Sequence, residues 1–424
     1  MHSRRFLFSA AAVVLAVASQ PAAAQRSETY ISRLKDAEAR IAALPASAWD
    51  TTRSPEKNAA LRPFIPALET LGMERAFAGD TAGAIAAYDA KDRTRSTRPV
   101  ANPAEATIVD EASVEDALQA IVEQARTRRV VLINEGHNVP MHRAFSQRLA
   151  RELRKIGCTY LACETFDALH PKAFSEGYAR QKGGYYTRDP VFGGWIAEAI
   201  ADGWQLVAYE SLGSDAALTP EQRIVARETL QASNLVERIF ANDKNAKVLI
   251  HVGYGHLDKG SATLPSGTDL VMMGEHLRRM TGLDMLHVDQ NRFYAHPDPA
   301  DDNPLYARAL ARTTATAPFV LKAKDGSYAV LLDQKGRVDM QVVFPRYAFH
   351  DQNGRPEWLA TLAGRRPRAL PPELLPVSGR RAVLAYRAGE PADAVPADVV
   401  LVEAGKPAPK LMLPDGEYRF AVEE

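Results

Sequence analysis

The chain has 424 residues, of which 46% are hydrophobic and 25% are charged. This composition can build a core, and the length is too great for one compact domain, so we expect two or three folded units. Lysine plus arginine equals aspartate plus glutamate, at 52 each, which gives no net field to attract nucleic acid, and we expect no nucleic-acid partner.

Residues 1–24 have the pattern of a secretory signal peptide. Arg4 and Arg5 form its charged region, residues 6–18 are apolar, and the small residues 22–24 form a cleavage site. The apolar run is too short to remain as a membrane anchor. We therefore expect a periplasmic or secreted protein with no stable membrane anchor after cleavage, exported by either the Sec or the twin-arginine route.

Residues 25–92 predict a helical cap. Apolar residues recur at helical spacing over residues 30–44, and residues 68–89 resemble one tetratricopeptide-type helical hairpin that turns at Gly79. An array of such repeats needs about three copies to be stable alone. A single hairpin therefore indicates a cap packed on the next domain and not a peptide-binding array.

The central unit, residues 108–300, carries ionisable residues at the ends of its predicted strands. Four short apolar runs are separated by helical segments, which predicts right-handed crossovers and a mainly parallel sheet. The residues that follow these runs are Glu135 with His137, Glu164, Glu210 and His256. Because ligands in open α/β sheets bind beyond the carboxyl ends of the strands, we expect these side chains to share one cleft. The competing interpretation is that Glu135 and His137 only cap a turn.

Further histidines lie close to these strand ends. His142 is in the first turn of the next predicted helix, on its apolar face, where the helix dipole disfavours a protonated ring. A neutral imidazole there can ligate a metal or act as a base, and the alternative is a packed core histidine. His287 and Asp289 could join from a fifth strand, whereas His251 lies within its strand and could face away.

Two mechanisms suit this set of side chains. In the first, Glu135, His137 and His256 bind a divalent ion (Zn, Mn or Co) with an open position for water, and the ion lowers the pKa of that water. In the second, a carboxylate–histidine pair activates water without a metal. In both, the water-activating centre consists of Glu135, His137, Glu164 and His256, with His142 in support.

A loop rich in glycine, tyrosine and arginine spans residues 177–195. Its residues Tyr185, Tyr186, Arg188 and Trp195 suit a mobile lid over a bound substrate. The alternative is that the aromatic side chains simply pack the loop down.

The tail, residues 316–424, predicts a separate β-sandwich-like domain. Short β-rich runs, among them residues 319–323 and 338–344, alternate with turn dipeptides such as Asp325-Gly326. No catalytic grouping occurs in this part of the sequence, so the chemistry is expected in the central unit.

Several of these motifs resemble those of a known superfamily. Residues 134–138 (Asn-Glu-Gly-His-Asn), with His142, resemble the opening motif of ChaN-like haem-binding proteins and the glutamate–histidine motif of erythromycin esterases. Glu164 matches the next acid of that pattern, and Arg227-Glu228 matches an Arg-Asp/Glu pair. Residues 252–257 resemble a terminal Gly-x-x-His motif that is also found in Tiki and TraB proteins.

The resemblance covers about residues 113–289 and implies an α/β fold of the EreA/ChaN-like (Tiki) type. Members include esterases, metal-dependent proteases and haem-binding proteins. We predict an exported hydrolase of ester or amide bonds that acts on a small molecule or peptide. The residues assigned to substrate binding are Arg188, Trp195, Glu210 and Arg227. The alternative is a periplasmic haem- or iron-binding protein of ChaN type. Its candidate haem-binding residues are His137, His142, Tyr185 and Tyr186. The oligomeric state stays open.

Overall fold

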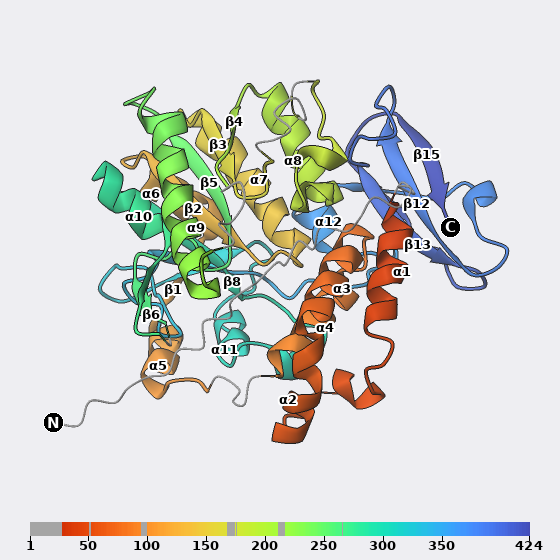
Figure 1. Ribbon diagram of the computed structural model, residues 1–424, viewed down its shortest axis with the longest axis horizontal. Helices are drawn as coiled ribbons and strands as arrows, with labels where there is room; N and C mark the ends of the chain where they lie inside the picture. Colours follow the sequence, from red (N-terminus) through yellow and green to blue (C-terminus); the bar gives the residue numbers. More distant parts are fainter. Residues whose placement is uncertain are drawn as a thin grey trace.

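The computed structural model describes residues 28–50, 52–94, 100–167, 174, 176–210, 217–264 and 266–424. The expected signal peptide lies outside these residues. Within them the chain forms a central eight-stranded sheet with flanking helices, a group of N-terminal helices, and small antiparallel sheets near the C-terminus (Figure 1). The predicted α/β class with a mainly parallel sheet is confirmed. No helix in the described part of the chain is both long enough and apolar enough to cross a membrane.

The central sheet has the strand order β1-β9-β10-β8-β2-β5-β3-β4. Six neighbouring strands, from β10 to β4, run parallel to one another, whereas β9 runs antiparallel to both β1 and β10. In sheet order the bounds are Ser113–Asp116, Phe319–Lys322, Met340–Val343, Met285–Phe293, Val130–Glu135, Val248–Gly253, Tyr160–Cys163 and Gln205–Ala208.

Helices cover both faces of this sheet. One face packs against α6 (Ala117–Ala125), α7 (Pro140–Lys155) and α8 (Pro190–Ala201), and the other against α9 (Pro220–Leu235) and α10 (Met273–Thr281). Alternate residues of each strand pack against the helices on opposite faces of the sheet, because successive side chains of a strand point to opposite faces. In β2, residues 131 and 133 pack on the first face and residues 130 and 132 on the second. This double burial explains why β2 is apolar without interruption.

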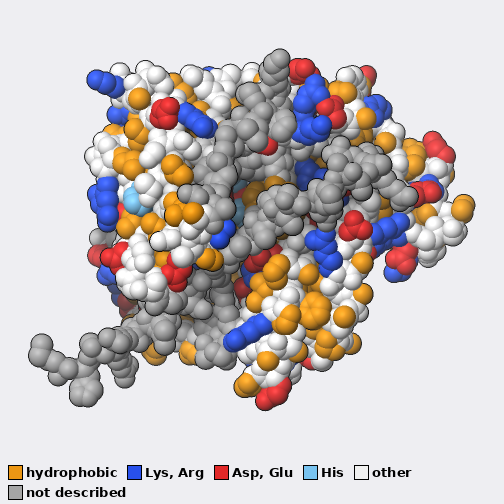
Figure 2. Space-filling model, in the orientation of Figure 1, with side chains coloured by type: hydrophobic (Ala, Val, Ile, Leu, Met, Phe, Trp, Pro, Cys, Tyr) orange, Lys and Arg blue, Asp and Glu red, His pale blue; other side chains and the backbone are white. Residues whose placement is uncertain are grey.

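The N-terminal helices are α1 (Tyr30–Arg40), α2 (Pro55–Leu61), α3 (Ile65–Phe77) and α4 (Thr81–Asp92), here called the helical cap. The α3–α4 connection contains Gly79 at φ 82°, a backbone conformation that glycine adopts without strain. On the face in Figure 2, hydrophobic side chains gather over the cap, and positive and negative side chains are interspersed elsewhere.

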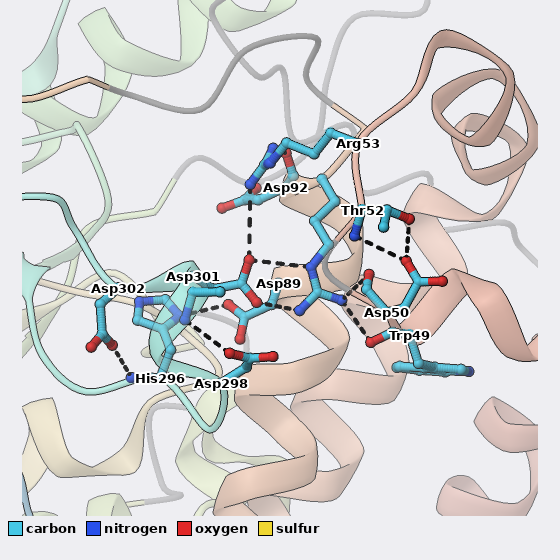
Figure 3. A network of polar contacts seen from close by, with 12 residues as sticks. Trp49, Asp50, Thr52, Arg53, Asp89, Asp92, His296, Asp298, Asp301 and Asp302 are labelled. Atoms are coloured by element: carbon cyan, nitrogen blue, oxygen red, sulfur yellow. Dashed lines mark hydrogen bonds and ion pairs between the residues drawn. The ribbon is translucent and has the colours of Figure 1, made fainter.

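A polar network joins the cap to the segment that follows β8 (Figure 3). Nε of Arg93 donates to Asp301 at 3.2 Å, and its Nη1 donates to the carbonyl of Trp49 at 2.9 Å. Nδ1 of His296 lies 2.6 Å from Oδ1 of Asp89 in α4. Because Asp89 and Arg93 are both buried, these contacts fix the cap against the central unit.

Two strands that the sequence placed in the C-terminal unit belong to the central sheet. Residues 319–322 form β9 and residues 340–343 form β10, and β10 pairs with β8 and not with the later strands. Their short apolar runs suit a buried strand in either sheet, so sequence pattern alone does not choose between them.

The remaining elements are small. A three-stranded antiparallel sheet near the C-terminus has the order β13-β12-β15, and two strand pairs are β11 with β14 and β6 with β7. These strands, in sequence order from β6, are Ser261–Thr263, Asp269–Val271, Arg366–Arg368, Arg380–Arg387, Asp398–Glu403, Leu411–Leu413 and Tyr418–Glu423. The short helices α5, α11 and α12 span Pro103–Glu111, Tyr306–Leu310 and Trp358–Thr361.

Candidate active site

The carboxyl ends of β2, β5 and β3 bring the predicted residues together. Glu135 ends β2 and stands in register with Gly253, which ends β5. Glu164 follows β3, and its N–H donates to the carbonyl of His251 in β5 at 3.1 Å. Two-residue alternation sends Glu135 to the α7–α8 face, like residue 133, and Glu164 to the α9–α10 face, like residue 162. The site therefore has two halves that meet above Gly253.

His137 occupies the meeting point. Its Nδ1 lies 2.9 Å from Oε1 of Glu135, and because an ionised carboxylate can only accept, Nδ1 carries the proton. The ring stacks on Tyr186 with centroids 3.8 Å apart, and Tyr254 meets its edge at 4.8 Å. This tautomer leaves the lone pair of the neutral ring on Nε2, which can accept a proton.

Arg143 of α7 holds Glu135 in its ionised form. Its Nε donates to Oε2 at 2.6 Å and its Nη2 to Oε1 at 2.8 Å, in the paired geometry that suits a carboxylate. Burial alone would raise the pKa of Glu135, but the charge of Arg143 and the hydrogen bond from His137 outweigh burial and lower that pKa. Arg143 also donates to the carbonyl of His137 at 2.8 Å and lies 3.5 Å from Asp189, the N-cap of α8.

The second half of the site is organised around Arg227 of α9. Its Nη2 donates to Oε1 of Glu164 at 2.6 Å, and its Nε donates to Glu210 at 3.0 Å. Its Nη1 lies 3.1 Å from Nε2 of His256. Burial would raise the pKa of Glu164, but the charges of His256 and Arg227 lower it to about 2.

His256 has a carboxylate on each side. Its Nδ1 is 2.7 Å from Oε1 of Glu228, whose other oxygen accepts the N–H of Met273 at the start of α10. Its Nε2 is 3.6 Å from Glu164. Burial would lower the pKa of His256, but Glu228 and Glu164 raise it to about 9. When the ring is neutral, Nε2 accepts from Nη1 of Arg227, and protonation of Nε2 requires this contact to open, because two N–H donors would then face each other.

Gly253 lets the two halves approach each other. A Cβ atom at this position would lie 2.5 Å from Nε2 of His137 and 2.9 Å from Oε2 of Glu164. The same backbone donates its N–H to that Glu164 oxygen at 2.5 Å. His137 and Glu164 therefore share the surface that only glycine leaves open.

We expect Gly253→Ala to lower the free energy of unfolding by about 1–3 kcal/mol, because the added methyl group overpacks the site. The control is Gly255→Ala, where the nearest heavy atom would be 3.6 Å from the new Cβ, an ordinary contact. Chemical denaturation of both variants measures the difference, and equal losses in the two would contradict this account of Gly253.

Three residues outside the sequence prediction complete the site. Arg143 binds Glu135, the carboxylate that contacts His137, and the carboxylate of Glu228 contacts His256 directly. Neither residue was assigned a place in the site, although Glu228 forms part of the Arg-Glu motif. His251, which could have faced away, has Nε2 3.6 Å from Oε2 of Glu135. Burial lowers the pKa of His251 to about 4, so its ring is neutral near pH 7.

Other predicted residues lie apart from this centre. His142 is fully buried between Tyr294 and Phe344, and its Nδ1 accepts the N–H of Gly136 at 3.0 Å. Burial lowers the pKa of His142 to about 3, so the predicted neutral ring is present, with the environment of a core histidine. His287 contacts the carbonyl of Leu257.

The loop residues assigned to a lid are packed down. Trp195 is 1% exposed and stacks on Phe192. Asp289, which lies outside this loop, accepts a hydrogen bond from Asn134 at 2.8 Å. Tyr185 and Arg188 both bind Glu74 of α3 and face the cap. Two of the four contact residues of the centre: Tyr186 stacks on His137, and Trp195 packs against the ring of His251 with centroids 5.1 Å apart.

No protein-family model and no curated protein matches the chain. Among solved structures, the type III effector HopBA1 is 15% identical, with a TM-score of 0.29 over 45% of this chain and 94% of the effector. ChaN of Campylobacter jejuni, solved with cofacial haem, is 12% identical, with a TM-score of 0.31 over 46% of this chain and 95% of ChaN. A bacterial protein toxin is 17% identical, with a TM-score of 0.31, and the match spans 54% of this chain and about half (46%) of the toxin. These are distant similarities, and the reaction must be argued from the site itself.

The donor set does not fit a divalent metal centre. Arg143 occupies both oxygens of Glu135, and Arg227 occupies Glu164 and Glu210, so a cation would have to compete with two guanidinium groups. Among the residues that the structure describes, no three His, Cys, Asp or Glu side chains are grouped so that they could hold a metal ion.

A haem group also does not fit the candidate ligands as they are placed. Nε2 of His137, the nitrogen that would bind iron, lies so close to Gly253 that an added Cβ atom would be 2.5 Å from it, and Tyr186 stacks on one face of the ring. His142 is fully buried, and the hydroxyl of Tyr185 donates to Glu74 at 3.2 Å. Each of these contacts would have to break before an axial bond to iron could form.

Proposed function

We propose that the chain is an exported hydrolase of ester or amide bonds in small-molecule or peptide substrates, and that His137 activates water without a metal. The observation that carries the proposal is the buried Glu135–His137 pair. Glu135 orients Nδ1–H, and Arg143 keeps the carboxylate ionised, so Nε2 is available as the base. A carboxylate in this position also stabilises the imidazolium that forms when the base takes a proton.

The two halves of the site supply opposite proton functions in this proposal. The oxygen of water attacks the carbonyl carbon while Nε2 of His137 takes its proton. His256, whose pKa is raised to about 9, is protonated at neutral pH and donates a proton to the leaving alcohol or amine. Exchange with solvent then returns both rings to their starting states. Two ionisable groups whose pKa values are driven apart by their surroundings suit such an acid–base pair.

The experiment is an assay of the mature chain against chromogenic esters and amides of varied acyl length, with and without EDTA. We expect turnover that EDTA leaves unchanged, and metal analysis of protein purified without chelators should find no stoichiometric ion. Loss of activity in EDTA with recovery in Zn²⁺, Mn²⁺ or Co²⁺ would instead support the metal-dependent mechanism, and turnover of no substrate would contradict the proposed function.

The alternative, periplasmic haem or iron capture of ChaN type, is tested on the same preparation. Titration with haemin should give only the absorbance of free haem, because His137 and Tyr185 already have polar partners and His142 is fully buried. A sharp Soret shift at one equivalent, lost in His137→Gln or Tyr186→Phe, would support the haem-binding alternative.

A further inference from the structure

Tyr186 covers one face of the His137 ring. Other neighbours also surround the ring: Cε1 and Nε2 lie close to Gly253, Tyr254 packs against it in a T-shaped contact, and Nδ1 is bound to Glu135. The Tyr186 and His137 planes are 14° from parallel, so the two rings are in full contact. Removing the Tyr186 ring would let the imidazole turn away from the geometry in which Nε2 is the base.

The helical cap binds residues on both sides of Tyr186 in the sequence, Tyr185 and Arg188. Its carboxylate Glu74 in α3 accepts from Nη2 of Arg188 at 2.8 Å and from the hydroxyl of Tyr185 at 3.2 Å, through one oxygen. Glu74 and Arg188 are 4% and 5% exposed, so their attraction is little screened by solvent. In addition, Tyr30 of α1 donates its hydroxyl proton to the carbonyl of Arg188 at 2.9 Å.

Two further sets of contacts hold the cap and the Tyr186 segment in place. The network in Figure 3 ties the α4 residue Asp89 and the following Arg93 to the segment after β8. The backbone N–H of Tyr186 also donates to Oγ1 of Thr165, the residue after Glu164, at 2.9 Å. The Tyr186 segment is therefore held between the cap and the central sheet, and Glu74 is the only charged cap residue that contacts it in the hydrogen bonds of the described residues.

We propose that Tyr186 is a positioning residue for His137, and that Glu74 of the helical cap keeps Tyr186 in place through Arg188 and Tyr185. The cap then completes the active site and is more than a stabilising addition. This inference rests on the proposed function only for its effect on turnover, because the position of the His137 ring can be measured without a substrate.

The experiment uses the full mature chain and two readouts. Ring protons of His137, identified by their loss in His137→Gln, should resonate upfield because the stacked Tyr186 ring shields them, and kcat is measured on the best substrate of the ester and amide panel. Tyr186→Leu should abolish the upfield shift and lower kcat by about 100-fold with a smaller change in KM, since small misplacement of a catalytic group has effects of this size. Tyr186→Phe should retain both the upfield shift and the wild-type kcat, because it keeps the aromatic ring that stacks on His137.

The contribution of the cap is tested by Glu74→Gln combined with Arg188→Met, which removes both buried charges and leaves neither unpaired. We expect a partial loss of the upfield shift and about a tenfold fall in kcat. Tyr185→Phe, which removes one hydrogen bond to Glu74, gives the same direction of change if the double variant does not fold. The matched control is Glu69→Gln, in the same helix, whose carboxylate pairs with Lys91 at 3.4 Å within the cap.

Retention of the upfield shift and of kcat in the Glu74/Arg188 variant would overturn the inference, and so would equal losses in Glu69→Gln. If the wild-type chain hydrolyses none of the substrates, the proposed function fails, and the His137 resonances alone still decide whether Glu74 and Tyr186 position the ring.

Discussion

Replacing His137 by glutamine should lower kcat by about 10²–10⁴-fold, the range expected when a general base is removed. The glutamine amide can still donate to Glu135, so the ion pair with Arg143 is retained and the fold should persist. The measurement is kcat on the best ester or amide substrate, together with thermal unfolding of the same preparation.

The matched control for this prediction is His276→Gln. His276 lies in α10, is partly exposed, and its Nε2 is 3.3 Å from the hydroxyl of Thr229, outside the His137 and Glu164 contacts. We expect wild-type kcat in this variant. Full activity in His137→Gln, or an equal loss in both variants, would show that His137 is not the base.

The strand ends were predictable from sequence because two local signals coincide there. An apolar run buried on both faces cannot continue through Glu135 or Glu164 unless these side chains leave the core or find partners. Parallel strands then place their carboxyl ends on one edge, which brings Glu135, Glu164 and His256 near one another despite their separation along the chain.

The partners of these residues depend on the three-dimensional packing of helices. Arg143 follows His142 directly, and helical periodicity does not say which of the two reaches Glu135. In the structure the arginine does, and His142 packs on Phe344. His251 faces Glu135 because it stands in register with residues 133 and 163, a pairing that exists only once the strand order is known.

The loop before α8 shows the same limit. Glycine, tyrosine and arginine suit a mobile lid as well as a packed segment, and the outcome depends on Glu74, more than a hundred residues earlier in the chain. Trp195 is apolar enough for either role, and in the structure it lies against His251 with ring centroids 5.1 Å apart. Long-range partners of this kind leave no local pattern in the sequence.

Glu135→Gln should lower the free energy of unfolding by about 3–5 kcal/mol, because it leaves a buried guanidinium group without its carboxylate. Arg143 is 0% exposed, and its other acidic neighbour, Asp189, is 3.5 Å away and already accepts from the N–H of Val191. Urea denaturation of wild type and variant at pH 7 measures the difference.

The control for solvent screening is Glu198→Gln, which breaks the pair between α8 and Arg151 of the same helix α7. That pair is partly exposed, so the expected loss is about 1 kcal/mol or less. Equal losses of unfolding free energy in Glu135→Gln and Glu198→Gln would show that burial does not strengthen the Glu135–Arg143 pair.

Adding Arg143→Met to Glu135→Gln should recover most of the lost stability, because both charges leave the core together and the two changes are strongly coupled. Turnover should not recover with it. The double variant still lacks the carboxylate that fixes Nδ1–H of His137 and stabilises the imidazolium, so a stable but inactive protein separates the catalytic role of Glu135 from its part in the fold. A double variant that is both stable and fully active would remove Glu135 from the mechanism and leave His137 without an orienting group.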